Sequence, residues 1–119
     1  MKTHKDLNAW KESIELVVSV YEIAGRFPKH EMFCLTQQLR RAAVSVPSNI
    51  SEGAARNYKR EFIRFLRISM GSLTEVETQV IISWKLRYIE EPEMKAVIGR
   101  IYLIRSQIAG LIKSVGITK

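Results

Sequence analysis

Five basic side chains lie close together in the middle of the chain and could bind phosphate groups. They are Arg56, Lys59, Arg60, Arg64 and Arg67. At about 100° per residue, Arg60, Arg64 and Arg67 fall within about 60° of one another on a helix. The apolar residues Phe62 and Leu66 fall on the opposite side. These cations are therefore expected to project away from a core, and planar guanidinium groups suit phosphate recognition.

The distribution of charge favours a polyanion as the partner of this segment. The chain has 119 residues and a formal net charge of +7. Residues 29–67 hold eight basic and three acidic residues, so this part of the chain carries most of the excess. A local excess of this kind is typical of nucleic-acid-binding proteins. The alternative is a solvated surface on which Glu61 and neighbouring acidic residues pair with the arginines.

A second basic pair, Arg40 and Arg41, lies close to the apolar seam of an earlier helical segment. Buried or partly buried arginines need acidic partners. Glu75 and Glu77 of the next segment are the expected partners, which would form structural ion pairs between two helices. A direct phosphate role is the alternative, particularly at the mouth of an oligomeric channel.

Residues typical of catalysis or metal binding do not form a recognisable site. His4 and His30 lack the spacing of metal ligands, and no glycine-rich phosphate-binding loop is present. Cys34 has no nearby histidine or second cysteine and is expected to be a buried structural thiol. The sequence therefore predicts a protein that is not an enzyme, with no catalytic residues, no metal and no cofactor.

The charged residues are carried by four segments in which apolar residues recur at spacings of three and four, as in helix bundles. No segment shows the alternation of a strand, so the predicted fold class is all-α. We expect helices over residues 6–25, 31–54, 59–89 and 92–115, in a single domain of residues 1–119. Short connections favour an antiparallel up-down-up-down four-helix bundle.

Pro47 interrupts the second helical pattern, which continues beyond it as Ile50 and Gly53. A proline inside a helix removes one hydrogen bond and clashes with the carbonyl four residues earlier. We therefore predict a continuous second helix that is kinked at Pro47. Two helices with a break at residues 45–48 are the alternative.

The third helix has more apolar surface than one bundle needs. Its predicted main seam consists of Phe62, Leu66, Ser69, Leu73, Val76, Val80 and Ser83. A second apolar stripe lies roughly 90° around from this seam and contains Ile63, Met70, Ile81, Trp84 and Tyr88. Helices that are apolar on several sides are buried on several sides. We therefore predict self-association, with this stripe at the oligomer interface. The small residues Ser69, Gly71 and Ser72 are expected to allow the close approach of a neighbouring helix.

Composition indicates an ordinary globular protein, since 46% of the residues are apolar and 26% are charged. Residues 1–10 lack the apolar run of a signal peptide, and the single cysteine cannot form an internal disulfide. No apolar run approaches the roughly 20 residues needed to cross a bilayer. We therefore expect a cytoplasmic protein with no membrane partner.

A long segment in the centre of the chain resembles a known family. Residues 38–53, of sequence QLRRAAVSVPSNISEG, together with residues 61–66 and 71–78, closely resemble the bacterial four-helix-bundle proteins encoded in intervening sequences of 23S ribosomal RNA genes. The resemblance implies a bundle that assembles as a homopentamer. A similar fold in the accessory variability protein of diversity-generating retroelements, a basic pentamer that binds nucleic acid and a reverse transcriptase, implies by analogy nucleic acid and a nucleic-acid-processing protein as partners.

These features together predict a non-enzymatic, oligomeric protein that binds nucleic acid, RNA in particular, through phosphate contacts. Few exposed aromatic residues are expected among the basic groups, so base stacking is not indicated. The alternative is an oligomeric scaffold for protein–protein interaction that has no specific nucleic-acid role.

Overall fold

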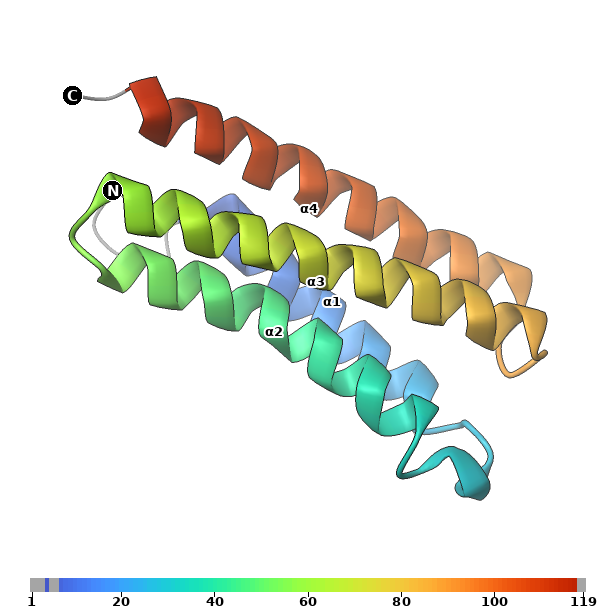
Figure 1. Ribbon diagram of the computed structural model, residues 1–119. Coiled ribbons are helices and arrows are strands. Elements are labelled where there is room, and N and C mark those ends of the chain that lie inside the picture. Colours follow the sequence, from blue (N-terminus) through green and yellow to red (C-terminus); the bar gives the residue numbers. More distant parts are fainter. Residues whose placement is uncertain (1–3, 5–6, 118–119) are drawn as a thin grey trace.

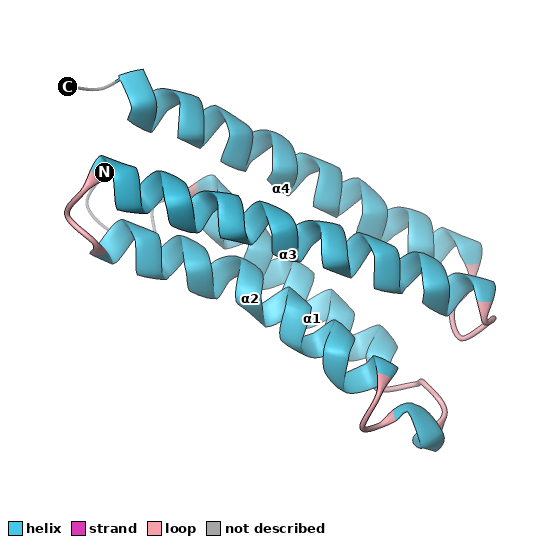
Figure 2. Ribbon diagram, viewed as in Figure 1, coloured by secondary structure: helices cyan, strands magenta, loops and turns pink. Residues whose placement is uncertain are grey.

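The computed structural model describes residue 4 and residues 7–117, and all the regular structure in this part of the chain is helical. It consists of α1 (Asn8–Ala24), the short 3-10 helix η2 (Lys29–Glu31), α2 (Leu35–Ala55), α3 (Lys59–Lys85) and α4 (Glu91–Ile117). Figure 2 shows helices joined by short loops, with no strand in the described part. The all-α fold class is therefore confirmed for these residues. The predicted helix start at residue 6 lies outside them.

The long helices run alternately in opposite directions along the molecule (Figure 1). α2 packs against α1 and α3, and α4 packs against α3 and α1, so each long helix has two helical neighbours. The molecule measures 49 × 25 × 19 Å along its principal axes. This is the up-down-up-down arrangement that short connections favour.

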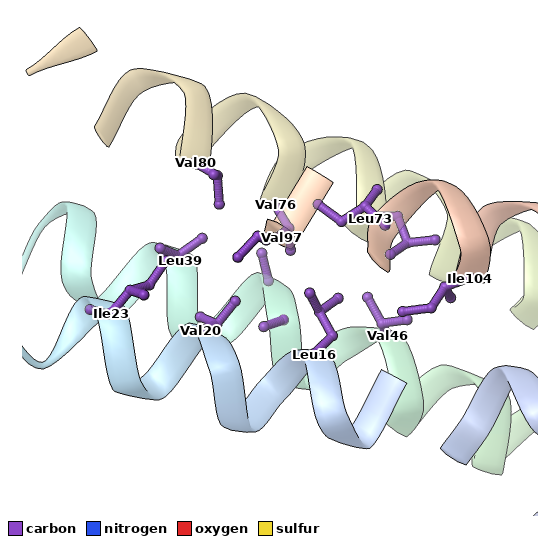
Figure 3. Packing of buried hydrophobic residues seen from close by; sticks show 14 of the residues in the cluster. Leu16, Val20, Ile23, Leu39, Val46, Leu73, Val76, Val80, Val97 and Ile104 are labelled. Carbon is purple, nitrogen blue, oxygen red and sulfur yellow. The ribbon is translucent and has the colours of Figure 1, made fainter. Parts of the chain in front are cut away.

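The apolar seams of the long helices meet in one core (Figure 3). The largest fully buried side chains come from all of them and include Leu16, Val20, Leu39, Val46, Ile50, Leu66, Leu73, Val76, Val80, Ile101, Ile104 and Ile108. Burying one such side chain contributes about 1.5–3 kcal/mol relative to leaving it exposed. The predicted main seam of α3 is buried throughout, at Phe62, Leu66, Ser69, Leu73, Val76, Val80 and Ser83.

α2 runs unbroken through Pro47, so the alternative of two helices separated at residues 45–48 is wrong. Proline has no N–H to donate to the carbonyl four residues earlier. Ser51 Oγ donates to the Pro47 carbonyl at 2.9 Å, and Ser69 Oγ of α3 donates to the Val46 carbonyl at 2.9 Å. These hydroxyls bond to carbonyls beside the proline, and not to the Ala43 carbonyl, which is the one that loses its helical donor. A kink in the helix axis at Pro47 stays a prediction.

Two helix ends differ from those predicted. α2 begins at Leu35 rather than at residue 31, because Cys34, with φ −123° and ψ −105°, lies outside the helical region of backbone space. α3 ends at Lys85 rather than at residue 89, because Arg87 adopts a left-handed conformation with φ 67°. The residues beyond each of these ends therefore belong to the connections of the bundle.

Of the two glycines, Gly53 and not Gly71 lies in close contact with the facing helix. A Cβ added at Gly53 would lie 2.7 Å from Phe65 Cβ and 3.1 Å from Phe62 Cδ1. A Cβ added at Gly71 would meet no described atom within 4 Å. The predicted close approach is confirmed at Ser69 and Ser72, whose hydroxyls meet the Val46 carbonyl and the Ser45 hydroxyl of α2. It is wrong at Gly71, which faces outward. The tight contact instead lies beside the turn that joins α2 to α3.

Candidate nucleic-acid interface

The turn between α2 and α3 brings the predicted basic residues to one end of the bundle. Arg56 caps the end of α2, and Tyr58 caps the start of α3. Both residues have an extended backbone conformation. The Arg56 N–H donates to the Gly53 carbonyl at 3.2 Å, and the Phe62 N–H donates to the Tyr58 carbonyl at 3.0 Å. The absence of a side chain at Gly53 lets α3 pack directly against the end of α2. A short, well-bonded turn therefore presents residues 56–60 to solvent.

The first turns of α3 have an apolar inner side and a cationic outer side. Phe62 is 7% exposed and Leu66 is fully buried. Arg60, Arg64 and Arg67 are all exposed. This is the orientation that the helical spacing predicts. We refer to Arg56, Lys59, Arg60, Arg64 and Arg67 as the basic surface.

Glu61 neutralises part of the basic surface. Arg64 Nε and Nη2 each donate to a Glu61 carboxylate oxygen at 3.1 Å. Arg56 Nη1 lies 3.8 Å from Glu61 Oε1, and Arg56 Nη2 lies 3.8 Å from Glu52 Oε1. The hydrogen bond from Arg64 holds the pKa of Glu61 below its usual range, and the same bond raises the pKa of Arg64. The alternative of surface ion pairing therefore applies to Arg56 and Arg64.

The ring of Phe65 supports the same two arginines. The guanidinium carbon of Arg64 lies 4.5 Å from the ring centroid, and that of Arg56 lies 5.1 Å from it. Phe65 itself is only 9% exposed. A buried ring that carries two guanidinium groups restricts their positions, because cation–π attraction and apolar contact both favour stacking.

The remaining three cations of the basic surface form no ion pair among the described residues, although Arg60 is near enough to Glu61 to help lower the pKa of that carboxyl. Lys59, Arg60 and Arg67 have no carboxylate within 4 Å in this part of the chain. All three side chains are exposed. Because no ion pair holds them, these cations can approach successive phosphates without first breaking one.

Comparison with known proteins places this bundle in a family. The model of the family described as 23S rRNA-intervening sequence protein matches residues 5–110. The chain belongs to this family. No curated protein matches it. Its fold is similar to that of a protein of unknown function from the S23 ribosomal protein family of Bacteroides thetaiotaomicron VPI-5482, with a TM-score of 0.81, 20% identity, and coverage of 88% of this chain and 95% of that one.

Arg40 and Arg41 of α2 do not form the predicted ion pairs with Glu75 and Glu77 of α3 among the described residues. Instead, Arg105 Nη2 of α4 donates a hydrogen bond to Glu77 Oε1 at 2.9 Å. Tyr102 donates a further hydrogen bond to Glu77 at 3.0 Å. The bond from Arg105, followed by that from Tyr102, lowers the pKa of Glu77. The prediction was wrong for Glu77, because helical spacing does not specify that α4 lies beside this position.

Arg40 and Arg41 have different surroundings from those predicted. The guanidinium of Arg40 lies 4.7 Å from the centroid of the Tyr21 ring of α1, and its buried Nε has no described hydrogen-bond partner. Arg41 and Glu75 line one pocket between α2 and α3 without forming an ion pair within 4 Å. Apolar and aromatic contact therefore replaces the predicted pairing for Arg40.

The predicted interface stripe of α3 is partly used inside the chain. Met70, Trp84 and Tyr88 pack against the core, and Tyr88 Oη donates to Glu31 at 2.7 Å. Ile63 is half-buried, whereas Ile81 is exposed. The exposed apolar residues of α3 and its C-cap are Ile68, Ile81, Ile82 and Leu86. We refer to these four as the apolar surface of α3.

Two residues differ in exposure from what the sequence indicates. Cys34, predicted to be buried, is exposed, because it precedes the first turn of α2. Tyr58 is 72% exposed beside the basic surface, although few exposed aromatic residues were expected there. Its position directly before the helical pattern, where the core seam has not begun, is the signal that could have revealed it.

The remaining described side chains form no group that suggests metal chemistry. Among them, no cluster of three or more histidine, cysteine or acidic residues could hold a metal ion. His30 Nε2 lies 3.4 Å from Tyr88 Oη. The helices of the described part also include none that is long and apolar enough to span a membrane.

Proposed function

We propose that this protein is a non-enzymatic RNA-binding protein whose basic surface contacts phosphates. The observation that carries the proposal is a group of exposed cations at the start of α3, Lys59, Arg60 and Arg67, that form no ion pair within 4 Å with any described residue. Arg56 and Arg64 flank them and are held in place by Phe65. The family description, which refers to a 23S rRNA intervening sequence, supports RNA as the polyanion. We further propose that the chain acts as a single domain in the cytoplasm.

We also propose that the protein is a homo-oligomer, in keeping with the homopentamer that its family resemblance implies. The apolar surface of α3 supports this proposal, since Ile68, Ile81, Ile82 and Leu86 are each between 38% and 50% exposed. An oligomer would present several copies of the basic surface to one RNA molecule. Linked weak sites of this kind bind far more tightly than one site alone. The proposed relation to the accessory variability protein of retroelements would add a nucleic-acid-processing protein as a partner.

A second candidate function is that of a protein-interaction scaffold. The face between α1 and α2 favours it, because a groove there is lined by Tyr21, Met32, Phe33 and Val44, with Arg40 and Arg41 beside them. Phe33 is 82% exposed and Met32 is 52% exposed. Exposed apolar patches are typical of interaction sites. In this alternative, binding to nucleic acid would be weak and would not discriminate between polyanions.

The test is a charge reversal at the basic surface. Nuclease-treated wild type and the double variant Lys59→Glu, Arg60→Glu are titrated with fluorescently labelled RNA at several salt concentrations. We expect the variant to lose affinity by roughly 10- to 100-fold and its salt dependence to fall by about one to two ion equivalents.

The matched control is Lys29→Glu, Lys95→Glu, which changes the net charge by the same amount. Lys29 belongs to η2 and Lys95 lies near the start of α4. Both of these segments are at the opposite end of the bundle from the α2–α3 turn (Figure 1). We expect the control to lose much less affinity than the test variant. Equal losses in the two variants would show that only net charge matters, and would favour the scaffold function.

A further inference from the structure

Tyr58 is an exposed aromatic residue in the middle of a cationic segment. It is 72% exposed and lies in the chain between Arg56 and Lys59. Its backbone is extended, with φ −128° and ψ 128°, and its carbonyl accepts the first hydrogen bond of α3 from the Phe62 N–H at 3.0 Å. The position of Tyr58 is therefore set by the start of a stable helix, while its ring faces solvent.

The aromatic ring that packs into this end of the bundle is that of Phe65, not that of Tyr58. Phe65 is 9% exposed, packs against Gly53 and carries the guanidinium groups of Arg56 and Arg64. A ring that is 72% exposed contributes little to the core. The two aromatic residues thus have different environments, since Phe65 positions cations and Tyr58 presents a free face beside them.

Together, a ring and neighbouring cations match the chemistry of an unpaired nucleotide. A base has a π face that stacks on an exposed aromatic ring, and its flanking phosphates attract Lys and Arg. In an A-form duplex the bases are stacked on one another, so the duplex offers mainly phosphates and hydroxyl groups. Phosphate contacts alone therefore do not distinguish paired from unpaired RNA, whereas a stacking ring does.

We propose that Tyr58 is a stacking platform for an unpaired base of RNA, with the flanking phosphates on Lys59 and Arg60. This inference rests on the proposed function and narrows its substrate to single-stranded or looped RNA. The C-terminal part of α4 lies at the same end of the bundle (Figure 1), where a Cβ on Gly116 would lie 3.9 Å from Ile63 Cδ1 of α3. Because Tyr58 is 72% exposed among the described residues, an unpaired strand can reach its ring.

The test compares Tyr58→Ala and Tyr58→Phe with wild type on two RNA probes. One probe is a single-stranded oligoadenylate, and the other is a fully paired RNA duplex of the same length. We expect Tyr58→Ala to weaken single-strand binding by roughly tenfold, in line with the loss of one base–aromatic stack. We expect Tyr58→Phe to bind the single strand like wild type. Duplex binding and the salt slope should be unchanged in both, because no cation is lost.

The control variant is Phe33→Ala, which removes a ring that is 82% exposed near the opposite end of α2. It should bind both probes like wild type. Circular dichroism should show equal helicity and equal melting temperature for all variants. If Tyr58→Ala weakens single strand and duplex equally, or leaves the single strand unaffected, the stacking role is wrong.

A different experimental result would contradict the proposed RNA-binding function itself. If Lys59→Glu, Arg60→Glu leaves the binding of both probes unchanged, then the basic surface does not bind RNA. If that charge reversal weakens binding and Tyr58→Ala does not, the function stands and only the stacking platform is overturned. The two variants therefore separate the two conclusions.

Discussion

In α3, residues 59–67 carry cations on the outer side of the helix, whereas residues 81–86 carry isoleucine and leucine there. Arg64 and Ile82 face the same way, because they are about five helical turns apart. Both halves of the helix share one buried seam. A single helix can therefore present one apolar seam to the core along its whole length, while its solvent side differs between its two halves. One half is suited to phosphates and the other to apolar contact.

Both halves lie against α2 and α4, but the closest contacts that hold each half differ. The N-terminal half packs against α2 at Gly53, where Phe65 approaches closely. The C-terminal half is linked to α4 through Glu77, Arg105 and Tyr102. Substitutions can therefore disturb one half while leaving the other intact.

The largest expected effect is on self-association through the C-terminal half. Ile82 is 43% exposed and Leu86 is 50% exposed, and they lie one helical turn apart. The variant Ile82→Asp, Leu86→Asp would place two carboxylates in the proposed apolar contact, at a cost of at least about 3 kcal/mol per contact. We expect sedimentation equilibrium to show an oligomer for wild type and a monomer for the variant.

The matched control places the same charges on other exposed apolar residues, Val18 of α1 and Leu103 of α4, which are 55% and 46% exposed. Val18→Asp, Leu103→Asp should leave the oligomer intact. A monomeric wild type, or dissociation by the control and not by the test variant, would show that the apolar half of α3 is not the interface.

The next largest effect is on the packing of the N-terminal half. Gly53→Ala would place a Cβ within 2.7 Å of Phe65 Cβ, and overpacking of this kind costs about 1–3 kcal/mol. Gly71→Ala meets no described atom within 4 Å, so it should stabilise α3 by up to about 1 kcal/mol through helix propensity. Urea denaturation measures the change in unfolding free energy of each variant. Equal changes in the two variants would contradict the difference in packing.

A smaller effect is expected at the link between the C-terminal half and α4. Glu77→Gln removes the charge that Arg105 and Tyr102 share, and we expect a loss of about 1 kcal/mol at neutral pH. Because the pKa of Glu77 is lowered in the folded chain, its contribution is full above the unfolded pKa of about 4.3. It is lost as the pH falls through the folded value.

Urea denaturation at pH 7 and at low pH tests this dependence. The difference in unfolding free energy between wild type and Glu77→Gln should shrink as the pH falls below about 4. A difference that stays constant across this range would mean that the carboxylate charge does not stabilise the link.

The smallest effect is expected from Glu61, which partly neutralises the N-terminal half. Glu61→Gln would release Arg64 from its paired hydrogen bonds and remove one negative charge. We expect RNA affinity to rise by roughly two- to fivefold at low salt. The control Glu52→Gln removes the same charge but only a 3.8 Å contact with Arg56. A rise no larger than that of the control would indicate that Arg64 does not bind phosphate.

Much of the fold could be predicted from the spacing of apolar residues. The seam from Phe62 to Ser83 and the outward direction of Arg60, Arg64 and Arg67 both follow from an angle of about 100° per residue. The family segment at residues 38–53 and its continuous helix were also predicted. The helix ends at Cys34 and Arg87 were not, because they depend on backbone conformations in the connections.

By itself, the sequence determined that the chain forms four long helices and which side of each helix faces the core, since the apolar pattern repeats along each helix axis. Only the tertiary structure decided the neighbours: that Glu77 meets α4, that Gly53 rather than Gly71 meets another helix, and that Tyr58 is exposed beside the cations. The physical reason is that periodicity specifies an angle around a helix axis. It does not specify which helix lies at that angle, or how closely the two approach.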